Sequence, residues 1–217
     1  HADVLPRRLH VLLVIPREQD NHELLRVLPP SEPHDVSTGI MPFVDHPQVA
    51  RLHESRSIVL TQMSRFDEAL AELTGVIGPI ERAYGTDSLP RGKLAFAIGE
   101  IQRKHGNYPA ATAAYRQALA IYQRADDEVE TARALLGIGI TAKEVGQLEA
   151  ARTSYEQARA AAERALPASE RLLAVILQYH SSTLQGDELP QAERELTRAL
   201  EIRARIYGPD SVSVAQT

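Results

Sequence analysis

Apolar side chains between residues 45 and 209 recur three and four positions apart, the spacing of a helix with one buried face. Each stretch ends at a turn signal, and the stretches come in pairs. We expect helices at residues 47–62, 66–84, 88–105, 108–124, 128–145, 148–165, 169–185 and 189–207. No apolar run approaches the ~20 residues that a membrane-spanning helix needs. The pattern predicts an all-α chain without a membrane segment.

The helix pairs belong to an internal repeat. Small residues at equivalent places, Ala69, Ala111, Ala151 and Ala192, lie 42, 40 and 41 residues apart. Residues 80–88 resemble residues 203–211, which lie 123 positions later, or three periods of 41. A fixed period of this length is typical of stacked helical repeats. The predicted units cover residues 45–86, 87–126, 127–168 and 169–209, and the start of a fifth follows.

Turn residues separate the predicted helices. Gly106, Gly146 and Gly186 fall where the first helix of a pair must reverse, which favours a residue that tolerates positive φ. Four polar residues stand where helices should begin and are the expected N-caps: Asp45, Asp87, Asp127 and Ser169.

The second and third units carry a recognisable signature. It consists of Ala95, Ile98, Gly99, Gly106, Tyr108, Ala111, Tyr115 and Ala118, and of Leu135, Ile138, Gly139, Gly146, Leu148, Ala151, Tyr155 and Ala158. These positions resemble the tetratricopeptide repeat, in the long-period version found in kinesin light chains and in bacterial regulatory proteins. The resemblance implies a right-handed superhelical solenoid of antiparallel helix pairs. Two departures are Ser57, where the family prefers Gly, and one extra residue between Gly186 and Ala192.

Small and large residues alternate as close helix packing requires. Gly99 and Gly139 let paired helices approach, while Tyr115, Tyr155 and Leu196 are large enough to fill the space beside them. Enlarging a small contact residue, as in Ala151→Leu, is expected to overpack the helix contact at a cost of roughly 1–3 kcal/mol.

Residues 1–44 do not follow the period. They hold six of the thirteen prolines. We expect this segment to be an N-terminal cap over the first helix pair, or alternatively the tail of a preceding domain. Because the chain begins with His1 rather than Met, we expect it to be a piece of a larger protein.

Composition removes several classes of chemistry. With no Cys there is no disulfide, thiol nucleophile or Cys-ligated metal. A net charge of -5 disfavours a general nucleic-acid binder. Residues 85–94 resemble a phosphate-binding loop only superficially, because six residues rather than four separate the glycines. We therefore expect no catalytic, cofactor or metal residues and no enzymatic activity, and we expect a cytoplasmic protein.

What remains is a surface. The resemblance implies that the first helix of each pair lines a concave, peptide-binding face. The family's peptide-binding positions can be transferred to each unit by their place in the first helix. They are Arg51, Glu54, Ser55, Ile58, Thr61 and Gln62 in the first unit; Lys93, Phe96, Ala97, Glu100, Arg103 and Lys104 in the second; and Arg133, Leu136, Gly137, Ile140, Lys143 and Glu144 in the third. Arg51, Lys93 and Arg133 would form one basic row, and Arg103 and Lys143 a second. Phe96, Leu136 and Ile140 would offer apolar pockets.

These positions favour a non-enzymatic interaction module that binds a protein or peptide, with an acidic segment as the candidate ligand. The expected setting is a larger regulatory or scaffolding protein. Two alternatives stay open. One is self-association, including a homodimer, through an uncapped C-terminal face. The other is the sensor arm of an enzyme whose catalytic domain is absent from this chain.

Overall fold

A computed structural model describes residues 47–208, with side chains from residue 52 onward. All described residues belong to one unit of the chain, residues 40–217. The described part is helical and holds no strand. Its elements are α1 (Pro47–Gln62), α2 (Phe66–Gly75), α3 (Ile77–Tyr84), α4 (Leu89–Lys104), α5 (Tyr108–Arg124), α6 (Glu128–Glu144), α7 (Leu148–Arg164), α8 (Glu170–Ser181), the 3-10 turn η1 (Gly186–Glu188) and α9 (Leu189–Tyr207).

Several expectations fall outside the described residues. These are the N-cap at Asp45, the role of residues 1–44, and the start of a fifth helix pair after residue 209.

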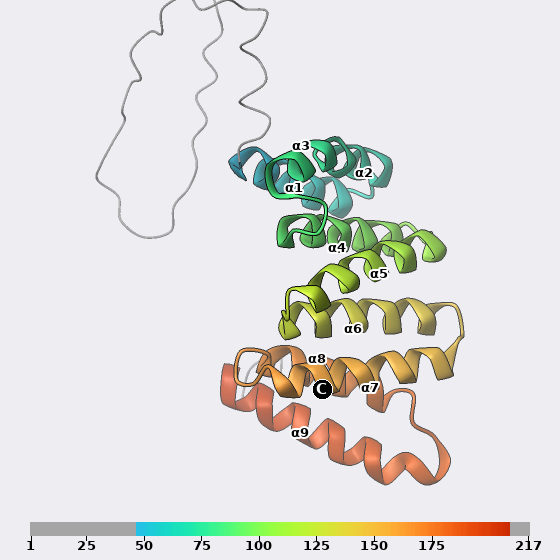
Figure 1. The fold of residues 1–217 in the computed structure, drawn as a ribbon. Coiled ribbons are helices and arrows are strands. Elements are labelled where there is room, and N and C mark those ends of the chain that lie inside the picture. Colours follow the sequence, from blue (N-terminus) through green and yellow to red (C-terminus); the bar gives the residue numbers. More distant parts are fainter. Residues whose placement is uncertain (1–46, 209–217) are drawn as a thin grey trace, which may run out of the picture. The chain divides into compact units, whose positions relative to one another are not determined.

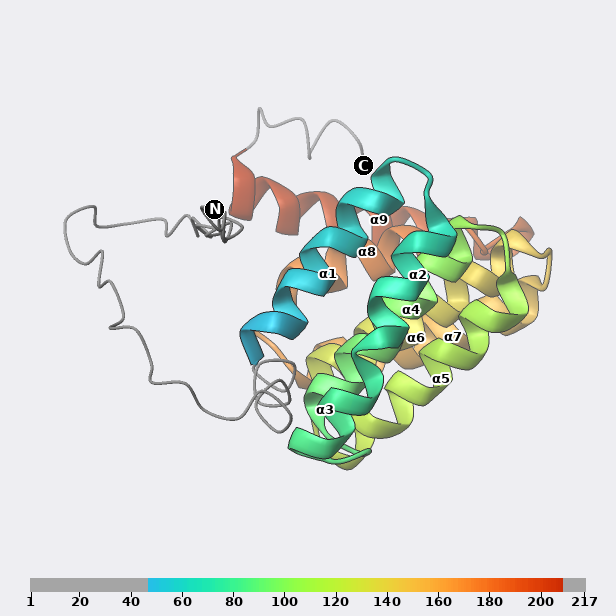
Figure 2. The same ribbon diagram turned by 90° about the horizontal axis from the view of Figure 1, so that it is seen from above.

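The helices stack pair upon pair in chain order (Figure 1). Each first helix packs on the second helix of its own pair, and that second helix packs on the first helix of the next pair. Successive first helices also touch one another, α1 with α4, α4 with α6 and α6 with α8. No comparable contact joins α5 to α7 or α7 to α9. The first helices therefore lie on the inner side of the stack, and Figure 2 shows the pairs from above.

The expected helix 66–84 is wrong in one respect, because it is two helices. α2 ends at Gly75 and α3 begins at Ile77, with Val76 between them. Pro79 explains the break. It has no N–H to donate to the carbonyl of Gly75, and its ring clashes with that carbonyl.

The capping of the helices differs in part from expectation. Ser88, not Asp87, is the N-cap of α4, and its hydroxyl accepts from the N–H of Arg91 at 3.4 Å. Asp127 caps α6 as predicted, accepting from the N–H of Glu130 at 3.1 Å. Ser169 precedes α8, but its buried hydroxyl donates to the carbonyl of Ala162 instead of capping the helix.

The reversals within pairs match the prediction. Gly106 and Gly146 have φ of 83° and 77°, the left-handed region that glycine enters without steric cost. The extra residue of the fourth unit is accommodated at η1, the 3-10 turn that follows the shorter helix α8. The expected helix 169–185 accordingly ends at Ser181.

Small–large pairing holds the stack together. A Cβ at Gly99 would lie 2.7 Å from the ring of Tyr115, and one at Gly139 would lie 2.5 Å from the ring of Tyr155. Both tyrosines are fully buried. The predicted close contacts are therefore confirmed.

The fourth unit reverses this pairing of sizes. His180 stands where the repeat has Gly139, and Leu196 stands where it has Tyr155. The imidazole is completely buried, and its Nδ1 lies 2.7 Å from Oε2 of the buried Glu195. A ring on the first helix thus fills space that a ring on the second helix fills in the second and third units.

Candidate functional site

The inner face, formed by the first helices α1, α4, α6 and α8, carries most of the residues predicted to bind a partner. In the first basic row, Lys93 is exposed and has no ion pair among the described residues. Arg133 keeps 47% of its side chain exposed and has one carboxylate nearby, Glu130 at 3.5 Å. The side chain of Arg51 lies outside the described part of the chain. This row is therefore available to a ligand at Lys93 and Arg133.

The second basic row is already engaged. The Nη1 of Arg103 lies 2.9 Å from Glu144 of the next unit, and its Nη2 lies 3.3 Å from Glu100. The hydroxyl of Tyr115 also donates to Glu100, and burial together with this carboxylate raises the pKa of Tyr115. A guanidinium that is matched by two carboxylates offers little net charge to a ligand.

Lys143 has a milder engagement. Its Nζ lies 2.5 Å from the hydroxyl of Ser182, a neutral partner, so its charge stays unbalanced. Lys104 is exposed in the last turn of α4. Glu54 is half-buried and already engaged in a polar or electrostatic interaction.

The predicted apolar positions differ in how open they are. Phe96 is half-buried and packs against Tyr115, with ring centroids 5.4 Å apart. Leu136 is only 7% exposed and belongs to the core, so it supports the face rather than lining a pocket. Ile140 is half-buried, whereas Ile58 on α1 is 59% exposed.

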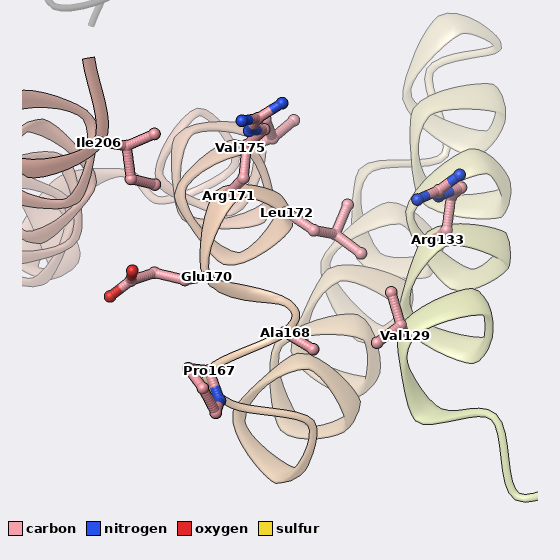
Figure 3. Close-up of a pocket in the computed structure, with 9 residues that line it drawn as sticks. All are labelled: Val129, Arg133, Pro167, Ala168, Glu170, Arg171, Leu172, Val175 and Ile206. Atoms are coloured by element: carbon pink, nitrogen blue, oxygen red, sulfur yellow. The ribbon is translucent and has the colours of Figure 1, made fainter. Parts of the chain in front are cut away.

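A hollow of about 550 Å³ lies between the N-terminal halves of α6 and α8. Apolar side chains form much of its lining: Val129, Ala168, Leu172, Val175 and Ile206. Figure 3 shows Val129, Ala168 and Leu172 between the two helices, with the guanidinium groups of Arg133 and Arg171 at the rim. The hollow therefore pairs an apolar interior with two cationic groups.

The charges at this hollow are predominantly positive. Glu170 also belongs to its lining, but its carboxylate points away from α6 and pairs with Arg205 (Figure 3). The guanidinium of Arg171 lies over the ring of Tyr207, 5.2 Å from the centroid. That contact leaves the N–H groups of Arg171 free to donate, because an aromatic face attracts the cation without accepting its hydrogen bonds.

Sequence reasoning identified Arg133 but missed the rest of this hollow. The phase of the first three units was carried along α1, α4 and α6 and was not extended to α8. Arg171 also stands one turn earlier in its helix than Arg133 does, near the place where α6 has Glu130. The hollow could not be found from one helix, because it forms only where the first helices of two neighbouring units lie side by side.

The described residues show no centre for metal chemistry. Within residues 47–208 no group of three or more His, Asp or Glu side chains converges as metal ligands would. None of the helices described is long and apolar enough to span a bilayer.

The model of the tetratricopeptide repeat family matches residues 48–124 and 94–164, which together cover more than half of the chain. This chain belongs to the tetratricopeptide repeat family. Repeats of this family are in general protein-interaction modules. No curated protein matches the chain.

Solved structures share the fold. BtubC (BKLC) from P. vanneervenii superposes with a TM-score of 0.64 at 17% identity, covering 73% of this chain and 65% of its own length. A protein described as a kinesin light chain with nearly identical TPR-like repeats, from Podosopora anserina, gives 0.59 at 18% identity, covering 79% and 82%. The predicted kinesin-light-chain-like solenoid is thus confirmed as a fold. The chain spans 65% of the length of BtubC.

Proposed function

We propose that this tetratricopeptide repeat chain is a non-enzymatic module that binds an acidic segment of a partner protein along its inner face. The observation that carries the proposal is the hollow between α6 and α8, where Arg133 and Arg171 flank an apolar interior of about 550 Å³. An apolar side chain of the ligand would enter the hollow while carboxylates beside it meet the guanidinium groups.

The distribution of free cations supports an acidic ligand. The chain has a net charge of -5, yet Lys93, Arg133 and Arg171 on this face share a single carboxylate partner among the described residues, Glu130 at 3.5 Å from Arg133. Charge-assisted hydrogen bonds to carboxylates are among the stronger polar contacts that a surface can make. Arg103, already paired with Glu100 and Glu144, would contribute less to binding.

The proposal extends to the setting of the chain. A ligand-binding stack of repeats without chemistry of its own suits a regulatory or scaffolding role within a larger cytoplasmic protein.

A peptide-display selection tests the proposal. The probe is a random-peptide library selected on the wild-type chain at low salt, and the enriched peptides are then measured against the wild type and the double variant Arg133→Glu, Arg171→Glu. We expect enriched peptides to carry Asp or Glu beside a large apolar residue. Their affinity should fall at least tenfold in the double variant, about 1.4 kcal/mol or more, and should weaken at high salt because exposed charges are screened.

Arg116→Glu is the matched control. It makes one Arg-to-Glu reversal, as each half of the double variant does, on α5, a second helix, and should leave the affinity unchanged. Peptides without acidic residues, or acidic peptides that bind the double variant as well as the wild type, would contradict the proposal.

A further inference from the structure

The outer face of α9 exposes a row of leucines. Leu189 is 59% exposed and Leu200 is 39% exposed, and with Leu196 they line a shallow hollow of about 390 Å³. Among the described helices, α9 packs mainly against α8 and η1, and side chains join it to α7 through Arg159–Glu195 and Arg198–Glu163. Three leucines on one open helix face form an apolar surface without a partner in this part of the chain.

The repeat shows what kind of neighbour this face fits. Leu189, Leu196 and Leu200 stand 81 residues after Tyr108, Tyr115 and Leu119 of α5. All three of those residues face the next first helix, α6. Tyr108 shares a hollow with Val145, the ring of Tyr115 lies against Gly137, and Leu119 packs on the cluster that contains Ala134. α9 therefore presents the same face with which α5 contacts a first helix.

α1 presents the matching face. Leu52, Val59 and Met63 are 47%, 53% and 58% exposed. Their counterparts 42 residues later in α4 are covered by the preceding unit, because Leu94 and Ile101 are buried in a cluster with α2 and α3. His105, the counterpart of Met63, stacks on Phe66 at 5.0 Å.

We propose that the outer face of α9 docks α1 of a second copy of this chain, head to tail and antiparallel, as α5 docks α6. The contacts inside the chain fix the register. Two contacts place Leu189 of α9 against Met63 of α1. They are the stacking of Phe66 on His105 and the hollow that Tyr108 shares with Val145. Leu119 packs on the cluster that contains Ala134, and the equivalent arrangement brings Leu200 of α9 near Leu52 of α1.

Charge supports the same register. Thr112, Ile138 and Thr141 line one hollow at the contact of α5 with α6. Their counterparts at the new contact are Glu193 of α9, and Arg56 and Val59 of α1. Arg56 pairs through Nη1 with Glu72 at 2.9 Å, and its side chain is still 66% exposed, so the guanidinium can also reach the carboxylate of Glu193.

A second copy docked head to tail is favoured over a symmetric pair of α9 faces. A symmetric pair would join two second helices, and no two second helices pack closely on each other among the described residues. A head-to-tail contact leaves one free end on each copy, so it produces assemblies of increasing length rather than a closed dimer.

Analytical ultracentrifugation of two single variants tests the arrangement. Val59→Glu blocks the α1 face, and Leu200→Glu blocks the α9 face. We expect the mass of the wild-type chain to rise with concentration and each variant alone to stay a monomer. An equimolar mixture of the two variants should form a species of two copies and grow no further, because one intact face of each kind remains.

Ile58→Glu is the control, since it places the same charge on an exposed residue of α1 whose counterpart in α6, Ile140, does not line the hollow between α5 and α6. It should associate like the wild type, and circular dichroism should show unchanged helix content in all variants. A wild-type chain that stays monomeric at every concentration overturns the proposal. So does association of either single variant alone, or failure of the mixture to form the two-copy species.

Discussion

At the scale of single residues, glycine controls how closely the helices approach. Gly139→Ala would place a methyl group 2.5 Å from the ring of Tyr155, which is buried and cannot move aside. We expect a loss of roughly 1–3 kcal/mol in the free energy of unfolding, measured by urea denaturation. Gly75→Ala in α2 is the control. The added methyl group meets no atom within 4 Å, and the change should be neutral or stabilising because alanine has a higher helix propensity than glycine.

A buried charge cluster gives the fourth unit a dependence on pH. Glu195 accepts from Nδ1 of His180 at 2.7 Å, from Gln191 at 3.1 Å and from Arg159 at 3.2 Å. Burial alone would raise the pKa of Glu195, but these hydrogen bonds and the charges of His180 and Arg159 outweigh it and lower the pKa. The folded state therefore prefers the ionised carboxylate, and its contribution to stability is present above the ordinary value of 4.5.

We expect that contribution to be lost as the pH falls below 4.5 through the lowered pKa of Glu195. Glu195→Gln keeps the shape of the side chain and removes its charge. The stability gap between wild type and variant, measured by thermal unfolding from neutral pH downward, should close in that acidic range. Glu201→Gln, at an exposed position of α9, should show no such gap at any pH. A gap that stays constant with pH would mean that the Glu195 charge does not stabilise the fold.

At the scale of elements, the helix starts are stabilised unequally. The carboxylate of Asp127 caps α6, whereas the side chain of Gln147 makes no capping bond to α7. Asp127→Ala should therefore cost about 1 kcal/mol, the usual value of an N-cap. Gln147→Ala should cost little, and chemical denaturation of both variants compares them. Equal losses at the two positions would show that the cap of α6 is not specifically stabilising.

At the scale of the whole described stack, each unit is stabilised by its neighbours. α6 and α7 have helices on both sides, while α1 and α9 have them on one side. In such arrays local stability follows the number of neighbours, so we expect amide hydrogen exchange to be slowest in α6 and α7 and fastest in α1 and α9. Mass spectrometry of peptic fragments resolves this order. Uniform exchange along the stack would indicate a single cooperative unit instead.

Much of this fold could be predicted from the sequence because local sequence patterns determine the helices and turns of the repeat. Helical periodicity places the pairs, and Gly106 and Gly146 mark their reversals. The small residues Gly99 and Gly139 and the large Tyr115 and Tyr155 recur at fixed spacing, so their contacts follow from the period.

The tertiary structure alone decided which charged groups are free. Arg103 is paired because Glu144 lies 41 residues away on the next first helix, whereas Lys93 meets no carboxylate among the described residues. The hollow beside Arg133 and Arg171 exists only between two units, and only the packed helices show that the buried His180 pairs with Glu195. A local pattern determines each helix and its buried stripe. The ligand-facing surface depends on partners in neighbouring units, which the order of residues along one helix does not specify.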